Sequence, residues 1–206
     1  GIAMNINIQN NIPNVDVTLN KSADGSVSIL LTEKKVLTLG DIKCGEITKL
    51  GGREFYVLGH GAETTAVLVK DSVKRMSFGG NGDWRKSDVR SYCNGDFYKE
   101  LAAAIGAENI VQHTVKLVAD DGTGKGISCK DNVSILTTEL YRRYREYLPA
   151  MDEPWWTATR VTHDEDTGYA RDVCCVNSNG VLGWDVCDCG DGVRPFCILN
   201  SSILVS

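Results

Sequence analysis

Alternating apolar and polar positions near the start of the chain predict a β-hairpin. The run Val15-Asp16-Val17-Thr18-Leu19 alternates with a period of two, Ala23-Asp24-Gly25 favours a turn, and Val27-Ser28-Ile29-Leu30-Leu31 forms the second strand. The segment has too few apolar residues for a core of its own. Residues 4–33 therefore either assemble with another copy of the chain, giving a homo-oligomer, or belong to the main domain as a simple hairpin. We treat residues 1–33 as an N-terminal extension and residues 34–206 as the main domain.

Beyond residue 33 the pattern changes from strands to helices and back to strands. Helical spacing of apolar residues predicts two helices within 87–105, the first capped by Ser87 and ended by Asn94-Gly95. A third helix is expected over 137–148, with Thr137 or Thr138 as its cap. Strands are expected at 47–50 and 53–58 around a Gly-Gly turn, at 66–69, 155–160, 169–176 and 196–199. Segregated strands and helices of this kind predict an α+β fold.

Composition and charge narrow the function classes. The chain has 206 residues, 42% of them hydrophobic, and a net charge of −5 without a Lys/Arg stripe, which argues against a nucleic-acid-binding protein. No apolar run reaches the roughly 20 residues of a membrane span, so we expect no membrane insertion. No signal peptide is recognisable, and Gly1-Ile2-Ala3 before Met4 is typical of a cloning remnant. We therefore expect synthesis in the cytosol and association with a virion or another particle.

The sequence offers candidate chemistry that other features argue against. The eight cysteines include the neighbours Cys174-Cys175 and the pair Cys187 and Cys189, which we expect to share one strand face; these spacings favour free thiols. A zinc site made of these four cysteines is disfavoured, because adjacent residues of a strand point to opposite faces. His60 has no recognisable nucleophile as a partner, and the loop 120–126 lacks the EF-hand pattern. We expect no catalytic residue, no metal and no cofactor.

The stretch from Trp155 to Pro195 has the composition of a binding surface. From Val173 to the end there is no Lys, Glu, Gln or Met, while Asn, Asp, Ser and Gly are frequent. Short polar side chains on a stiff scaffold form adaptable contacts, as in antibody paratopes. A buried sheet that excludes long charged side chains would also explain the exclusion. The candidate ligand-binding residues are Asp172, Asn177, Asn179, Val181, Gly183, Asp185, Val186, Asp188 and Asp191.

Three tryptophans and two arginines form the expected frame of this stretch. Trp155, Trp156 and Trp184 are the scaffold aromatics. Each could either contact a ligand or pack in the hydrophobic core. We expect at least one of the adjacent residues Trp155 and Trp156 to lie in the core. Arg160 and Arg194 are expected to hold loops through carbonyl or carboxylate groups and not to touch ligand.

Several ordered blocks carry a resemblance to a known family. These blocks are Trp84–Arg90, Asn94–Phe97, Leu136–Glu139, Trp155–Arg160 and Gly192–Pro195. Together, over about residues 34–206, the chain resembles a family of bacterial and phage domains of unassigned function. It is similar in turn to the C-type-lectin-like fold shared by formylglycine-generating enzymes and retroelement-diversified variable proteins.

The resemblance implies a C-type-lectin-like domain that binds a cell-surface protein or glycan and makes or breaks no bond. Such a protein would act in receptor binding on a phage tail or bacterial surface. Whether a diversity-generating retroelement varies the segment stays open from the sequence. Two alternatives also stay open: a structural virion component without its own ligand, and a formylglycine-generating-type oxidase using Cys187 and Cys189. The carboxylates of Asp185, Asp188 and Asp191 argue against the oxidase, since they oppose thiolate formation.

Overall fold

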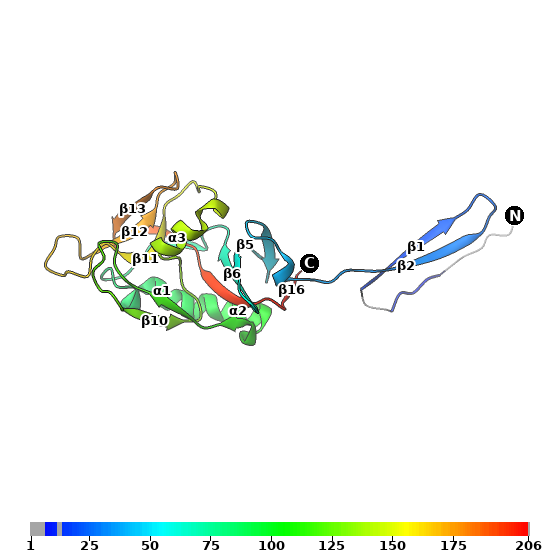
Figure 1. The fold of residues 1–206 in the computed structure, drawn as a ribbon, viewed down its shortest axis with the longest axis horizontal. Coiled ribbons are helices and arrows are strands. Elements are labelled where there is room, and N and C mark those ends of the chain that lie inside the picture. Colours follow the sequence, from blue (N-terminus) through cyan, green and yellow to red (C-terminus); the bar gives the residue numbers. More distant parts are fainter. Residues whose placement is uncertain (1–6, 12–13, 206) are drawn as a thin grey trace. The chain divides into compact units, whose positions relative to one another are not determined.

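The computed structural model describes residues 7–11 and 14–205, which belong to two compact units (Figure 1). The first unit ends at Leu37 and the main unit runs from Thr38 to Val205. The sequence placed this division a few residues earlier, after residue 33. The predicted cloning remnant and start residue Met4 lie outside the described residues.

The first unit contains the predicted hairpin. Strands β1 (Val15–Lys21) and β2 (Val27–Glu33) pair antiparallel. Gly25 adopts a φ of 88° in the connecting turn, a backbone conformation that favours glycine. Asp24 supports the turn, because its carboxylate accepts hydrogen bonds from the amide and hydroxyl of Ser26. The hairpin prediction is therefore confirmed.

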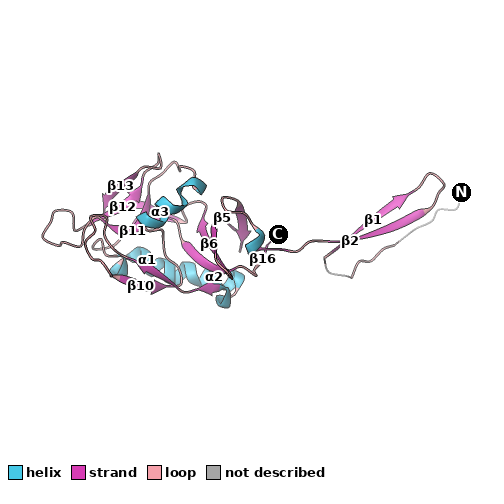
Figure 2. Ribbon diagram, in the orientation of Figure 1, coloured by secondary structure: helices cyan, strands magenta, loops and turns pink. Residues whose placement is uncertain are grey.

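The main unit is built from many short strands and a few short helices (Figure 2). Its strands before the helices are β3 (Leu37–Thr38, which begins at the unit boundary), β4 (Ile47–Leu50), β5 (Arg53–His60), β6 (Thr64–Val69) and β7 (Lys74–Ser77). The helices are α1 (Asp88–Tyr92), α2 (Tyr98–Ile105) and α3 (Thr138–Tyr144), with β8 (Ile110–Val111), β9 (His113–Lys116) and β10 (Ser128–Asp131) before α3. The remaining strands are β11 (Trp155–Arg160), β12 (Asp172–Val176), β13 (Leu182–Val186), β14 (Gly190–Val193), β15 (Phe196–Asn200) and β16 (Leu204–Val205).

Two five-stranded sheets organise these elements. One sheet has the order β4-β5-β6-β15-β8, and the other has the order β13-β12-β11-β14-β7, with β13 at its edge. β11 and β14 run parallel, whereas β11-β12, β12-β13 and β14-β7 are antiparallel. The smaller sheets are β10-β9 and β16-β3. The Gly51-Gly52 turn predicted between β4 and β5 is confirmed, with φ values of 57° and 79°.

The core has two parts, with helices on different sides of the sheets (Figure 1). In the larger part, Val89, Phe97 and Leu101 of the α1–α2 region pack with buried residues of both sheets. In the smaller part, Tyr141 of α3 packs with buried residues that include Trp155. The strand β12 contributes to both parts because alternate residues of a strand face opposite sides.

Helix caps were predicted correctly, but one helix boundary was not. Ser87 accepts a hydrogen bond from the amide of Arg90, and Thr137 accepts one from the amide of Leu140. The expected break at Asn94-Gly95 is wrong: Cys93–Phe97 forms a π-helical turn that joins α1 to α2. Asn94 stabilises this turn from within, because its amide group donates to the carbonyls of Arg90 and Val133.

The main unit is α+β, as the segregated pattern predicts. Strands precede and follow the helical part of the chain, and most strand pairs are antiparallel. No helix formed by the described residues combines the length and the hydropathy that a membrane crossing requires.

Candidate functional site

The predicted binding residues lie on and around the hairpin of β12 and β13 and on β14. The strands pair antiparallel, with Cys174 opposite Trp184 and Cys175 opposite Gly183. Side chains alternate along β13, so Trp184 and Val186 share one face while Gly183 and Asp185 share the other. The structure therefore divides the predicted surface into two groups on opposite faces of the edge strand.

Two predicted surface residues are buried, so their assignment to a ligand-contacting surface is wrong. Asp172 at the start of β12 is 5% exposed, and Asp191 on β14 is 3% exposed. Their strands lie inside the sheet order, covered on both sides, whereas β13 is the edge strand. The sequence argument relied on the frequency of small polar residues, and this frequency does not show whether a residue lies on an inner strand or on an edge strand of a sheet.

Asn177, Gly183 and Asp185 gather around the thiol of Cys175. The sulfur of Cys175 lies 3.7 Å from Oδ2 of Asp185 and 3.8 Å from Oδ1 of Asn177. Asn177 and Asp185 are half-buried, and Cys175 is fully buried. Burial and the neighbouring Asp185 carboxylate raise the pKa of Asp191 to about 7, and burial raises the pKa of the Cys175 thiol.

The other face of β13 carries an exposed aromatic pair. Trp184 is 53% exposed and Tyr169 is 54% exposed, and their ring centroids lie 5.8 Å apart at an interplanar angle of 82°. Val181, which precedes β13, is 54% exposed. Of the exposed large apolar residues described between Thr38 and Val205, these three lie in one short segment, whereas Ile47 and Leu204 lie elsewhere. We name Tyr169 and Trp184 the aromatic face.

The remaining predicted residues are exposed at the ends of β13. Asn179 lies in the turn before β13, where its side-chain oxygen accepts a hydrogen bond from the amide of Val181. Asp188 lies in the turn after β13 and forms an ion pair of 3.2 Å with Arg171. Both side chains can reach a partner that approaches the edge strand, although Asn179 also fixes the turn.

The three scaffold tryptophans divide between core and surface. Trp155 is 2% exposed and packs edge-on against Tyr141 at 5.5 Å, while Trp156 is fully buried and donates to the carbonyl of Met76. The core assignment is thus confirmed for both members of the adjacent pair, and a ligand platform is wrong for them. Trp184 differs, because it lies on the edge strand and not in the core.

Arg160 and Arg194 bind backbone carbonyls, as predicted. Arg194 is 1% exposed; it donates to the carbonyls of Val69 and Lys70 and lies 4.7 Å from the ring centroid of Trp155. Burial lowers the pKa of Arg194 to about 10. Arg160 donates to the carbonyl of Ala170. Neither guanidinium is available on the aromatic face.

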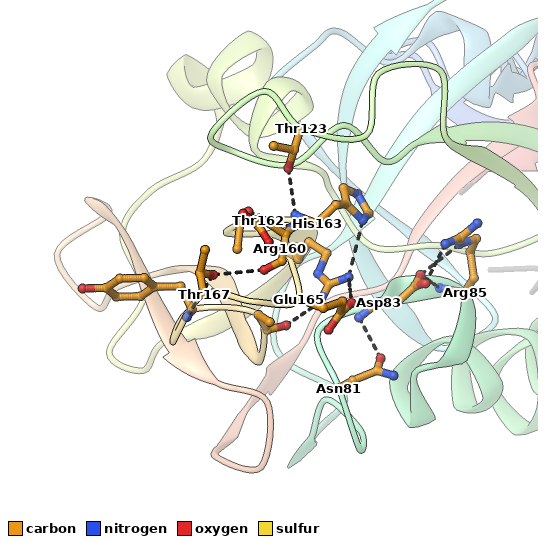
Figure 3. A network of polar contacts seen from close by, with 12 residues as sticks. Asn81, Asp83, Arg85, Thr123, Arg160, Thr162, His163, Glu165 and Thr167 are labelled. Carbon is orange, nitrogen blue, oxygen red and sulfur yellow. Dashed lines mark hydrogen bonds and ion pairs between the residues drawn. The ribbon is translucent and has the colours of Figure 1, made fainter.

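A polar network around Arg160 supports the loop that carries Tyr169 (Figure 3). Arg160 forms an ion pair of 3.0 Å with Glu165, so it ties both parts of the loop 161–171 to the end of β11. His163 fixes the other side of this loop, because its amide donates to Thr123 and its ring nitrogen Nε2 lies 2.7 Å from the carbonyl of Leu117. Tyr169 is therefore mounted on a segment anchored at several points.

The turn between β12 and β13 is also anchored. The hydroxyl of Tyr141 donates to the carbonyl of Gly180 at 2.6 Å, and the guanidinium of Arg145 contacts the same carbonyl. Gly180 has a φ of 79°, which favours glycine in this turn. The helix α3 and the residues after it thus hold the tip of the edge hairpin.

The cysteine-based alternatives lose support from the geometry. The expectation that Cys187 and Cys189 share a strand face is wrong: Cys187 is fully buried, whereas Cys189 is exposed, and both follow the end of β13. Partial desolvation and the carboxylates of Asp185, Asp191 and Asp188 raise the pKa of Cys189. Cys174 and Cys175 face opposite sides of β12, which disfavours the four-cysteine zinc site.

One serine–histidine pair was not recognised in the sequence. Nε2 of His113 lies 2.8 Å from the hydroxyl of Ser134, at a cleft that Glu139 and Arg143 also line. Ser134 is 1% exposed, and among the described residues no carboxylate forms a hydrogen bond with Nδ1 of His113. A catalytic triad requires a third group that orients the histidine and an accessible nucleophile, so this pair does not form one.

His60 contacts Thr65 and the carbonyl of Ile42, as a structural residue would.

Sequence reasoning missed Tyr169 as a functional candidate, and it considered Cys175 only as part of a disfavoured four-cysteine zinc site. Tyr169 lies in a loop where no apolar periodicity marks it, and its contact with Trp184 joins residues on different segments. Cys175 meets Asp185 and Asp191 from separate strands. The chain matches no family model, no curated protein and no solved structure, so both candidates rest on the geometry described above.

Proposed function

We propose that this chain is a non-enzymatic binding protein, carried on a phage or bacterial surface, that recognises a cell-surface protein or glycan through the aromatic face. The observation that carries the proposal is the edge-to-face pair of Tyr169 and Trp184, each about half exposed, with Tyr169 on the anchored loop 161–171 and Trp184 on the anchored edge hairpin. An exposed tryptophan on a protein surface is a typical binding anchor, because it supplies a large contact area with few rotatable bonds.

The physics of the edge hairpin fits recognition. The loop of Tyr169 is fixed by Arg160 and His163, and the hairpin tip is fixed by Tyr141, so little conformational entropy is lost when a partner binds. Asn179 and Asp188 flank the aromatic face with hydrogen-bonding groups. Indole rings stack on the apolar faces of sugars, and the flanking polar groups would bind the hydroxyls.

The resemblance to C-type-lectin-like variable proteins supports the same proposal. It also implies that a diversity-generating retroelement varies the residues of the binding surface. If a retroelement varies this segment, the exposed positions Asn179, Val181 and Asp188 are the ones that tolerate change. A side chain at Gly183 would place its Cβ 2.7 Å from the amide of Asn177, so this position tolerates less. The buried Asp172 and Asp191 belong to the fixed frame.

The test is binding of the full-length protein to a panel of immobilised bacterial surface glycans and to intact bacterial cells. For any probe that binds, Trp184→Ala and Tyr169→Ala are expected to weaken the affinity by about thirtyfold, equivalent to loss of a hot spot of about 2 kcal/mol.

The matched control is Ile47→Ala, which removes an exposed apolar side chain (42% exposed) from β4 of the other sheet. It should leave binding unchanged. Equal affinities for the three variants and the wild type would show that the aromatic face is not the binding surface.

A further inference from the structure

A cluster of potential metal ligands lies on the side of β13 opposite to Trp184. The thiol of Cys175 on β12, the carboxylate of Asp185 on β13 and the carboxylate of Asp191 on β14 have ligand atoms that all lie within 4.8 Å of one another. These residues come from three strands of the same sheet, in which β11 separates β12 from β14. The convergence is therefore a property of the folded sheet and not of one loop.

The charge of this cluster is poorly compensated by the protein. Asp191 is only 3% exposed, yet its Oδ2 has no hydrogen-bond partner among the described residues. Its carboxylate neighbour, Asp185, has the same sign of charge. Arg75 is a cation close enough to act on Asp191 electrostatically, but its Nε donates to the carbonyl of Gly190 and its guanidinium also pairs with Glu153. Asp191 interacts with Asp185 and Cys175, but a buried, ionised carboxylate with an unpaired oxygen and a like-charged neighbour is costly, and a cation at this place would offset that cost.

The donor atoms select the type of cation. One sulfur with two carboxylates suits a borderline-soft divalent ion such as Zn²⁺, whereas Ca²⁺ and Mg²⁺ take oxygen ligands only. With a Zn–S bond of about 2.3 Å and a Zn–O bond of about 2.0 Å, an S–O edge of a tetrahedron measures about 3.5 Å. The sulfur of Cys175 lies 3.7 Å from Oδ2 of Asp185, within a few tenths of an ångström of that edge.

A fourth donor lies beside the first three. Oδ1 of Asn177 is 3.8 Å from the sulfur of Cys175, so its distance also matches a tetrahedral edge. The backbone of Asn177 is fixed at the start of the hairpin turn by hydrogen bonds with Val181 and Gly180. Gly183 leaves room for its side chain, since a Cβ there would lie 2.7 Å from Nδ2 of Asn177.

We propose that Cys175, Asp185 and Asp191 bind a zinc-class divalent cation, with the side-chain oxygen of Asn177 as the fourth donor. On binding, the thiol proton of Cys175 and the proton of any protonated Asp191 leave to solvent, and the thiolate and two carboxylates offset the charge of the ion. Asp185 is half-exposed, which gives the ion a path from solvent. The bound ion would link the edge strand β13 to β14 across the sheet. This proposal is independent of ligand recognition by the aromatic face.

The test is titration of the chelator-treated, full-length protein with Co²⁺, a spectroscopic substitute for Zn²⁺. Wild-type protein is expected to bind a single equivalent with a thiolate-to-cobalt charge-transfer band, and Zn²⁺ should displace it. Asp191→Asn and Asp185→Asn are expected to weaken Co²⁺ affinity by about a hundredfold, because even loss of an outer-shell partner costs 10–100-fold. Cys175→Ser should abolish the charge-transfer band.

Matched controls are Cys189→Ser, an exposed thiol two residues after Cys187, and Asp188→Asn, an exposed carboxylate between them. Both should retain the wild-type band and affinity. If Cys175→Ser or Asp191→Asn fails to fold, the Co²⁺ affinity of Asp185→Asn tests the proposal by itself, because Asp185 is half-exposed and its substitution disturbs the core less. Absence of the band in wild-type protein, its loss in Cys189→Ser, or an unchanged affinity in Asp185→Asn would overturn the proposal.

Discussion

Arg194 and Asp191 are close in sequence and almost equally buried, but their surroundings differ. The guanidinium of Arg194 donates to two backbone carbonyls and stacks over Trp155, so its charge is distributed over several partners. The carboxylate of Asp191 has Asp185 as a neighbour and an oxygen without a hydrogen bond among the described residues. Arg194 can therefore stay charged although it is buried, whereas burial disfavours the ionised form of Asp191 when no cation is bound.

The raised pKa of Asp191 predicts a stability that falls with pH in chelator-treated protein. Asp191 ionises near 3.8 in the unfolded chain and near 7 in the folded protein. Between these values the folded state holds more protons than the unfolded state, so the free energy of unfolding decreases as the pH rises and levels off above about 7. We expect a decrease of about 2 kcal/mol from this group, after allowing for solvent screening through the half-exposed Asp185.

The measurement is urea denaturation at several pH values in the presence of chelator. The difference in free energy of unfolding between Asp191→Asn and the wild type should grow from pH 4 to pH 7, in favour of the variant. Asp188→Asn, which is exposed, serves as the control and should follow the wild type. A constant difference over this range would contradict the raised pKa.

For single residues, the sequence predicted the roles of those that act through local partners better than the contacts between residues on different strands. The backbone-holding roles of Arg160 and Arg194 were predictable from residue type and local context, and so was a core position for at least one of the adjacent tryptophans Trp155 and Trp156. The pairing of Tyr169 with Trp184 and of Cys175 with Asp191 was not, because strand order and loop paths bring them together.

Among the elements, the helical region shows how a tertiary contact overrides a local signal. Asn94-Gly95 is a turn signal, yet the chain continues through a π-helical turn into α2. The amide of Asn94 donates to two carbonyls, and its oxygen accepts from the amides of Asn132 and Val133. These contacts dock the helical segment on the chain that follows β10, and no local pattern could predict them.

Asn94→Ala is therefore expected to lower the free energy of unfolding by about 2–3 kcal/mol, since it leaves backbone groups of Val133 without their partner. The control is Ser91→Ala on the same helix, where a single exposed hydroxyl donates to the carbonyl of Ser87. This control should change stability by less than about 0.5 kcal/mol. Equal effects of the two substitutions in urea denaturation would show that Asn94 has no special role.

The edge strand β13 illustrates a second limit of sequence reasoning about elements. Its β character was predictable, but the candidate residues on its two faces were combined into one surface. Alternation places Trp184 with Val186 and places Gly183 with Asp185. Deciding which face contacts solvent required knowing what packs on each face: Trp184 is 53% exposed, whereas Asp185 is half-buried beside Cys175.

For the whole molecule, the α+β class and the separate N-terminal hairpin were predictable from pattern alone, and the C-type-lectin-like fold remains a proposal. The order of strands within each five-stranded sheet was not predictable, because β14 and β15 pair with strands from the first half of the chain. Such long-range pairing depends on packing across the core and not on neighbouring residues.

The N-terminal hairpin predicts self-association. Val17 pairs with Leu31 and Leu19 pairs with Ile29, so one face of the hairpin is apolar, and Ile29 and Leu31 are 54% and 57% exposed. A two-stranded sheet is marginal by itself, and a second copy of the chain would cover this face. We expect Ile29→Lys combined with Leu31→Lys to convert an oligomer of the full-length protein into a monomer, measured by light scattering.

Leu30→Lys is the matched control for this experiment. Leu30 is also 54% exposed, but it pairs with Thr18 on the opposite face of the hairpin. It should leave the oligomer intact. A wild-type protein that is already monomeric at high concentration would show that the hairpin has another role.

The uneven burial of the four tryptophans gives the protein a built-in optical reporter. Trp84, Trp155 and Trp156 are at most 2% exposed, so a soluble collisional quencher such as acrylamide or iodide reaches chiefly the fluorophore at position 184. Emission from that indole can therefore be followed in unlabelled protein. Whatever covers Trp184 should shield it from the quencher, while the other three signals stay as an internal reference.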